Sequence, residues 1–196
     1  MAKVIQYASP NITLQDWQAG LKSDIDIFED QLQGWVFDQA TALSKQTVPA
    51  SEHASYALLA LTAPYFEMIT CYLEGRETPK RMATEFLRRG LSTVLGSNAS
   101  RAAVQKYVTE LRNGIAHELM FRTVVLHHAS AKFPSFGIVR YAGADVLAID
   151  PFWLFTTMHD HFKNYVARLR NPTTSADKKL LARFNSFMGV RKSRRP

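Results

Sequence analysis

Apolar residues recur every three or four positions through the first part of the chain, which is the spacing of a helix with one buried face. Thr13 precedes this pattern and can cap the first turn with its hydroxyl. The pattern therefore predicts one long amphipathic helix over residues 14–35. Its apolar positions, which include two tryptophans expected to pack in the core, are Leu14, Trp17, Leu21, Ile25, Phe28, Leu32 and Trp35.

Helix start and stop signals predict three further helices before the middle of the chain. Proline bends a helix because it cannot donate a backbone hydrogen bond, and glycine favours the left-handed conformation of a helix end. The predicted helices run from Ser51 to Gly75 with a bend at Pro64, from Thr78-Pro79 to Gly96, and from Ser97 or Asn98 to the region of His117.

After Phe121 the composition changes to β-branched and aromatic residues, which are typical of strands. Three short strands are predicted over residues 123–126, 136–141 and 146–149, and Gly143 indicates a hairpin between the last two. Two helices are expected after the strands, one from Asp150-Pro151 to Asn171-Pro172 and one over residues 175–188.

These elements predict a mainly α fold, a helical bundle with a small antiparallel β-sheet inserted before its last main helix. Residues 1–170 would form the helical domain, with the β insertion near residues 122–149. Residues 171–196 would add a short helix and a basic C-terminal tail. The composition, with 46% hydrophobic and 21% charged residues in 196, is that of one globular domain.

Cysteine usage and hydropathy favour a soluble chain in a reducing compartment. Cys71 is the only cysteine, so no internal disulfide can form, and it is expected to be a small buried apolar residue. The most hydrophobic stretch, residues 56–69, is interrupted by Pro64 and Glu67 and is too short to span a bilayer. The first residues lack the apolar run of a signal peptide. We expect a cytoplasmic protein with no membrane partner.

The formal net charge of +7 suggests nucleic-acid binding, but the excess is confined to the C-terminal end. Seven of the 24 basic residues lie after position 177, and the remaining 17 match the 17 acidic residues. RNA or DNA would therefore be attracted by this end or by a local patch. The seven residues are Lys178, Lys179, Arg183, Arg191, Lys192, Arg194 and Arg195.

The segment Arg112-Asn113-Gly114-Ile115-Ala116-His117 combines residue types suited to RNA cleavage. A histidine can move protons near neutral pH, and an arginine can stabilise a charged phosphorus transition state. Asn113 and His117 share a helical face, whereas Arg112 points about 140° away from His117. An equally physical alternative is structural, since Asn, Gly and a cationic His suit a helix C-terminus.

The sequence from Leu111 to Glu118, with Arg112, a polar residue, three more residues and His117, resembles the motif of the HEPN superfamily. The resemblance extends over roughly residues 14–169 in architecture. It implies a homodimer whose two motifs face one cleft, acting as a metal-independent endoribonuclease of a toxin or defence system, with an antitoxin or other protein partner. His117 would be the general acid or base, Arg112 the phosphate stabiliser and Asn113 a positioning group. The predicted sheet after the motif departs from the best-known active families.

Other polar residues are weaker candidates for a functional site. Glu67 lies in an apolar helix and needs a partner, either Arg112 or a hydroxyl, so a structural role is favoured over a catalytic one. Four further histidines have no chelating spacing and are expected at the surface, so no metal site is predicted. They are His127, His128, His159 and His161. No glycine-rich phosphate loop is found, so no nucleotide cofactor is expected.

The leading interpretation is an RNA-directed protein, a candidate metal-independent endoribonuclease. The alternative is a non-catalytic nucleotide-binding, RNA-binding or protein-interaction domain in which the segment from Arg112 to His117 serves packing or dimer contacts.

Overall fold

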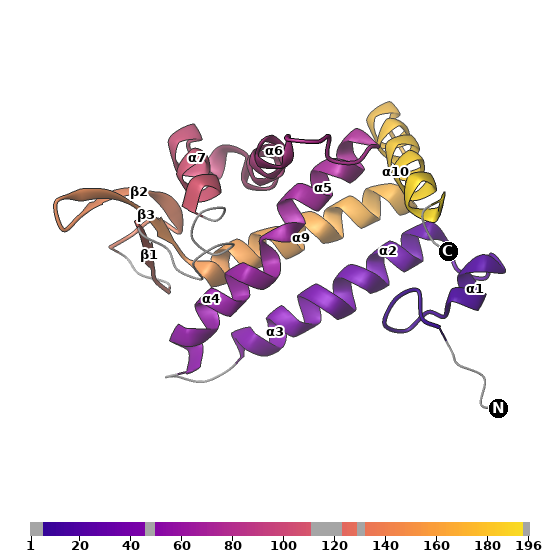
Figure 1. Cartoon of the computed structure of the whole chain (residues 1–196), viewed down its shortest axis with the longest axis horizontal. Helices are drawn as coiled ribbons and strands as arrows, with labels where there is room; N and C mark the ends of the chain where they lie inside the picture. The colour runs from indigo at the N-terminus through magenta and orange to yellow at the C-terminus, as the bar shows by residue number, and fades with distance from the viewer. Residues whose placement is uncertain (1–5, 46–49, 111–122, 129–131, 194–196) are drawn as a thin grey trace.

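Helix α9 (Pro151–Arg170) runs through the middle of the molecule, and other helices pack along it. The computed structural model describes residues 6–45, 50–110, 123–128 and 132–193. Asp150 begins α9, as predicted, because its side chain accepts hydrogen bonds from the backbone N–H groups of Phe152 and Trp153. Figure 1 shows the small sheet at one end of the long axis and α10 at the other.

The described part of the chain is mainly helical, with three strands. This confirms the prediction of a mainly α fold with a small sheet. The helices before the sheet are α1 (Leu14–Gln18), α2 (Asp24–Leu32), η1 (Gln33–Phe37), α3 (Asp38–Ser44), α4 (Ala50–Thr62), α5 (Pro64–Glu74), α6 (Ala83–Leu95), η2 (Gly96–Asn98) and α7 (Arg101–Glu110). The remaining elements are β1 (Val124–Leu126), β2 (Phe136–Tyr141), β3 (Ala144–Ile149), α9 and α10 (Ser175–Ser193).

The predicted continuous helix over residues 14–35 is wrong, because α1 and α2 are separate. Gly20 adopts a left-handed backbone conformation with φ of 74° just after α1. A new helix then starts at Ser23, whose hydroxyl accepts from the Asp26 N–H while the Asp26 carboxylate accepts from the Ser23 N–H. This reciprocal cap starts a new helix at Ser23, even though the apolar residues keep their helical spacing across the break.

A π-helical turn, η1, joins α2 to α3 and moves Trp35 out of its predicted place in the core. The wider turn changes which residues face inward, so Phe37 is fully buried whereas the Trp35 side chain is 53% exposed. Gly34 in the same turn packs on the N-terminal segment, where an added Cβ atom would lie 2.6 Å from Pro10 Cγ. The π-helical turn thus allows the close contact of Gly34 with Pro10 and leaves the Trp35 indole exposed.

Helices α4 and α5 follow the prediction closely. The break falls between Thr62 and Pro64, and Gly75 ends α5 in the left-handed conformation with φ of 73°. By length and a mean hydropathy of 1.2, the stretch Ala54–Glu74 could cross a membrane. In the fold 56% of that window is buried, which is consistent with a core helix of a soluble protein.

Helices α6 and α7 begin later than their sequence signals predicted. The Thr78-Pro79 pair forms a turn ahead of α6, in which the Met82 N–H donates to the Pro79 carbonyl at 2.9 Å. The Thr78 hydroxyl is occupied by other side chains and does not cap a helix. For α7, the cap is Ser100, whose hydroxyl accepts from the Ala103 N–H at 3.2 Å.

The sheet is mixed, which corrects the prediction of an antiparallel sheet. Strand β3 is central, pairing antiparallel with β2 and parallel with β1. The predicted hairpin at Gly143 is present, with Ala142 and Gly143 both at positive φ, as a two-residue turn of the type I′ class requires. Period-two alternation predicts strands but not their order, so the parallel pairing could not be read from the sequence.

Helix α10 packs into the same hydrophobic core as the rest of the bundle and extends to Ser193, beyond the predicted end at residue 188. Lys192 therefore lies on a helix, where its ammonium pairs with Asp24 at 2.7 Å. The residues of α10 that belong to the core are Leu180, Phe184, Phe187 and Met188.

Helices α5 and α6 approach each other closely at Gly90. A Cβ atom added to Gly90 would lie 1.7 Å from the Phe66 carbonyl oxygen. Beside it, the Thr70 hydroxyl on α5 lies 3.1 Å from the Phe66 carbonyl oxygen and 2.8 Å from that of Phe86 on α6. Only glycine permits this approach, so Gly90 is a packing requirement of the α5–α6 contact.

We expect Gly90→Ala to lower the free energy of unfolding by roughly 2 kcal/mol or more, because the added methyl group overpacks the α5–α6 contact. Urea denaturation of the full chain measures this change. Gly189→Ala on α10 is the matched control, since an added Cβ there meets nothing within 4 Å. That variant should be neutral or stabilised by up to about 1 kcal/mol. Equal effects of the two substitutions would contradict the packing account.

Candidate functional site

The predicted motif residues Arg112, Asn113 and His117 lie outside the described residues. The described residues on either side of this segment are Glu110 and Thr123. Glu110, the last residue of α7, accepts hydrogen bonds from Thr123, at 3.4 Å from the backbone N–H and at shorter range from the hydroxyl. The two flanks of the motif segment are therefore joined directly, and the chain runs from them into β1.

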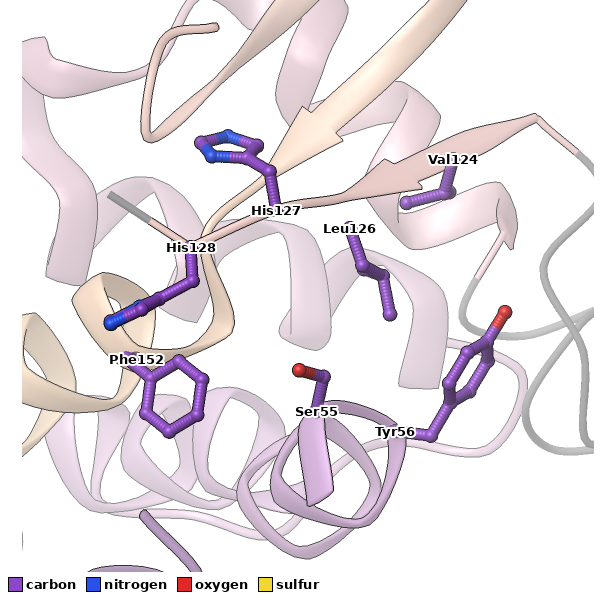
Figure 2. A pocket seen from close by; sticks show the side chains of 7 residues that line it. All are labelled: Ser55, Tyr56, Val124, Leu126, His127, His128 and Phe152. Carbon is purple, nitrogen blue, oxygen red and sulfur yellow. The ribbon is translucent and has the colours of Figure 1, made fainter. Parts of the chain in front are cut away.

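Strand β1 forms one wall of a pocket of about 600 Å³ against the N-terminal half of α4 and the start of α9. Figure 2 shows Leu126 pointing toward Ser55 on α4, with Tyr56 and Phe152 at either side. We call this the β1–α4 pocket, and it is lined by Ser55, Tyr56, Val124, Leu126, His127, His128 and Phe152. Its size is within the range typical of small-ligand sites.

Two histidines, His127 and His128, follow β1 directly and leave it in different directions (Figure 2). One ring nitrogen of His127 is hydrogen-bonded to the Pro134 carbonyl at 3.0 Å, while its Nδ1 is buried without a partner among the described residues. The exposed ring of His128 lies edge-on to Phe152 at 4.6 Å, and its Nδ1 is 3.8 Å from the Asp150 carboxylate. Asp150 thus lies beside His128 while it caps α9.

The described lining of this pocket supplies aromatic faces, two imidazoles and two hydroxyls, and it contains no carboxylate. An anionic ligand therefore meets no charge repulsion from these lining side chains, and a flat ring can lie against Tyr56 or Phe152. Sequence reasoning missed Ser55, Tyr56 and Phe152 as site residues, because their apolar surroundings predicted only packing. The sequence signal that could have indicated this site is the adjacent pair His127-His128 just after a predicted strand.

Glu67 has the hydroxyl partner that was one of its two predicted alternatives. The Thr78 hydroxyl donates to Glu67 Oε1 at 2.8 Å and also lies 3.3 Å from Cys71 Sγ. Glu67 does not line the β1–α4 pocket. This contact ties α5 to the turn before α6 and supports the structural role that was favoured for Glu67. Burial raises the pKa of the Cys71 thiol, in keeping with an inert buried cysteine.

His159 and His161, predicted at the surface, are half-buried, because both pack against core aromatics. His159 stacks on Phe37 with ring centroids 4.5 Å apart. His161 Nδ1 is 2.8 Å from the Tyr65 hydroxyl, and burial, helped by the positive charge of Arg168, lowers the pKa of His161 from 6.5 to about 4. Helical periodicity alone could not show how far the neighbouring helices cover this face of α9.

No group of three or more potential metal ligands occurs among the described residues. Helix α10, which carries five of the seven C-terminal basic residues, does not line the β1–α4 pocket and lies at the opposite end of the bundle from the sheet (Figure 1). Part of its charge is also engaged there, as Lys192 pairs with Asp24 and Arg183 donates to the Leu73 carbonyl. Any ligand of this pocket must therefore be recognised by local contacts.

Comparison of the chain with protein-family models, curated proteins and solved structures found no match.

We expect the free energy of unfolding to fall by roughly 1–3 kcal/mol as the pH drops from 6.5 toward 4, through His161. In that interval the unfolded chain binds a proton at this histidine and the folded protein does not, so protonation favours unfolding. His161→Gln can still accept from the Tyr65 hydroxyl and should flatten this dependence in urea denaturation. His128→Gln, at an exposed histidine, should leave it unchanged. A wild-type slope in His161→Gln would contradict the assignment.

Proposed function

We propose that this protein is a HEPN-like RNA-directed protein, a metal-independent endoribonuclease of a toxin or defence system that works as a homodimer. The observation that carries the proposal is the contact of Glu110 with Thr123, which joins the two flanks of the segment containing Arg112 and His117. From this junction the chain runs directly into β1, a wall of the β1–α4 pocket. The chain therefore leads from the predicted catalytic residues, through Thr123, into one wall of a ligand-sized pocket.

In this proposal His117 moves a proton between the RNA 2′-hydroxyl or the leaving oxygen and solvent. Arg112 stabilises the negative charge that develops on the phosphate oxygens, and Asn113 positions the imidazole or the substrate. The 2′-hydroxyl acts as the nucleophile within the RNA itself, so these protein groups suffice for cleavage without a metal ion. DNA lacks that hydroxyl and would not be cleaved.

The β1–α4 pocket would hold a nucleobase beside the scissile bond. Sequence-tolerant recognition of single strands combines stacking on aromatic side chains with contacts to the backbone. Tyr56 and Phe152 offer the aromatic faces, and the exposed His128 imidazole offers a donor to a phosphate or a base edge. Bases within a duplex are stacked on one another and cannot enter such a pocket. Single-stranded RNA is therefore the proposed substrate class.

We expect the purified full chain to cleave single-stranded RNA in the presence of EDTA, and His117→Ala to reduce the rate by at least about 100-fold, the usual contribution of general acid–base catalysis. Gel analysis of an end-labelled RNA measures both. Glu67→Gln is the control, since the Thr78 hydroxyl can still donate to its amide oxygen, and it should cleave at nearly the wild-type rate.

Loss of cleavage in EDTA would refute the metal-free mechanism. Background turnover by the wild type, together with lower melting temperatures or weaker dimerisation of Arg112→Ala and His117→Ala, would instead support the non-catalytic alternative. In that case the motif serves packing, and the protein acts as a binding or interaction domain.

We expect Tyr56→Ala to weaken binding of a single-stranded RNA by about tenfold, since one base–aromatic stack contributes roughly 1–3 kcal/mol. The Tyr56 side chain is 40% exposed, so its loss should disturb the core little. Fluorescence anisotropy with a labelled RNA in the His117→Ala background measures binding without cleavage. Tyr141→Ala, at a 52% exposed tyrosine of β2 outside the pocket, is the matched control. Equal losses of RNA affinity in the two variants would show that the β1–α4 pocket does not bind the RNA.

A further inference from the structure

A second pocket, at the other end of the bundle, is lined almost entirely by apolar side chains and contains one cation. Its volume is about 370 Å³. We call it the Arg191 groove, and it is lined by Phe28, Gln31, Leu32, Trp35, Val36, Met68, Tyr72, Phe187 and Arg191. These residues come from α2, η1, α5 and α10, so the groove exists only in the assembled bundle.

The Arg191 guanidinium is held in place by neutral partners. Its Nη1 donates to the Tyr72 hydroxyl, and its Nη2 donates to Gln31 Oε1 at 3.3 Å. Gln31 is buried and is itself fixed, because its amide nitrogen donates to the Ala8 carbonyl at 2.7 Å. No carboxylate in the described part of the chain forms an ion pair with Arg191, and Asp24 on α2 pairs with Lys192 instead.

A fixed, half-buried guanidinium that has no counterion among the described residues attracts an anion of matching shape. Arginine has five N–H donors, and the described contacts use two nitrogens, so donors remain for a carboxylate. The remaining lining offers few polar partners, so a singly charged group loses less hydration there than a phosphate dianion would. The charge and the apolar walls together define the chemistry of the occupant.

The exposed indole of Trp35 completes the groove. It stands at the rim because the π-helical turn η1 shifts it out of the core, and such turns often occur at functional sites. An exposed tryptophan beside buried aromatics offers a flat surface to an apolar ring or chain. The volume lies at the lower end of the range of small-molecule sites, which favours a compact ligand over a protein segment.

We propose that the Arg191 groove binds a small organic monocarboxylate with an apolar body, whose carboxylate pairs with Arg191 and whose body lies against Trp35. This site is separate from the β1–α4 pocket and does not depend on the proposed ribonuclease activity. The two pockets share no lining residue.

Phenylbutyrate and its neutral amide, phenylbutyramide, are suitable probes for titration of the full ¹⁵N-labelled chain. The indole N–H signals of Trp17, Trp35 and Trp153 report on three places in the fold. We expect saturable movement of the Trp35 signal, little movement of the Trp153 signal, and about tenfold tighter binding of the acid than of the amide. Arg191→Met should abolish the preference for the acid, and Lys192→Met, at the neighbouring ion-paired lysine, should keep it.

The proposal is overturned if Trp35 shows no saturable shift, if acid and amide bind equally to the wild type, or if the preference survives in Arg191→Met. If Arg191→Met does not fold, the comparison of acid and amide binding to the wild type tests the proposal. Arg191→Lys then serves as the second variant and should keep a reduced preference for the acid. Sedimentation that reveals a dimer dispersed by Trp35→Ala would assign the groove to a second copy and would also reject the small ligand.

Discussion

The fold depends on a cluster of aromatic rings around Phe28 of α2. Four rings lie within 6 Å of it, at centroid distances of 4.4 Å for Tyr72, 5.7 Å for Phe162, 5.9 Å for Tyr165 and 5.4 Å for Phe184. These rings come from α5, α9 and α10, so one side chain joins helices that are far apart in the sequence. Offset and edge-on pairs of this kind add stability beyond the area they bury. The same cluster forms the floor of the Arg191 groove through Phe28 and Tyr72.

The bundle separates two surfaces of different chemistry. At the sheet end, β1, α4 and α9 form a pocket with imidazoles and aromatic faces, and Thr123, just before β1, contacts Glu110 at the end of α7. At the other end, α10 carries five of the seven basic residues of the C-terminal region, and its Arg191 lines a mostly apolar groove. The charge excess that first suggested nucleic acid therefore belongs to the end opposite the proposed RNA site, and RNA recognition would depend on stacking and on the motif.

Local signals predicted those parts of the fold that depend on neighbouring residues. The Pro64 break, the Gly75 helix end, the Gly143 hairpin and the Asp150 cap all follow from backbone chemistry within a few positions. The exposure of Trp35 and the burial of His161 depend on a π-helical turn and on contacts with distant helices, and the parallel β1–β3 pairing depends on tertiary topology. The β1–α4 pocket was not predictable, because Ser55 and Phe152 meet β1 only in the folded chain.

In the proposed function, single-stranded RNA occupies the β1–α4 pocket. An NMR titration of the ¹⁵N-labelled His117→Ala protein, in which a single-stranded RNA remains intact, tests this binding site. We expect the largest backbone amide shifts at Ser55, Tyr56 and Leu126, while the indole signal of Trp35 stays in place. Shifts confined to α10, or no saturable shift at the pocket residues, would contradict it.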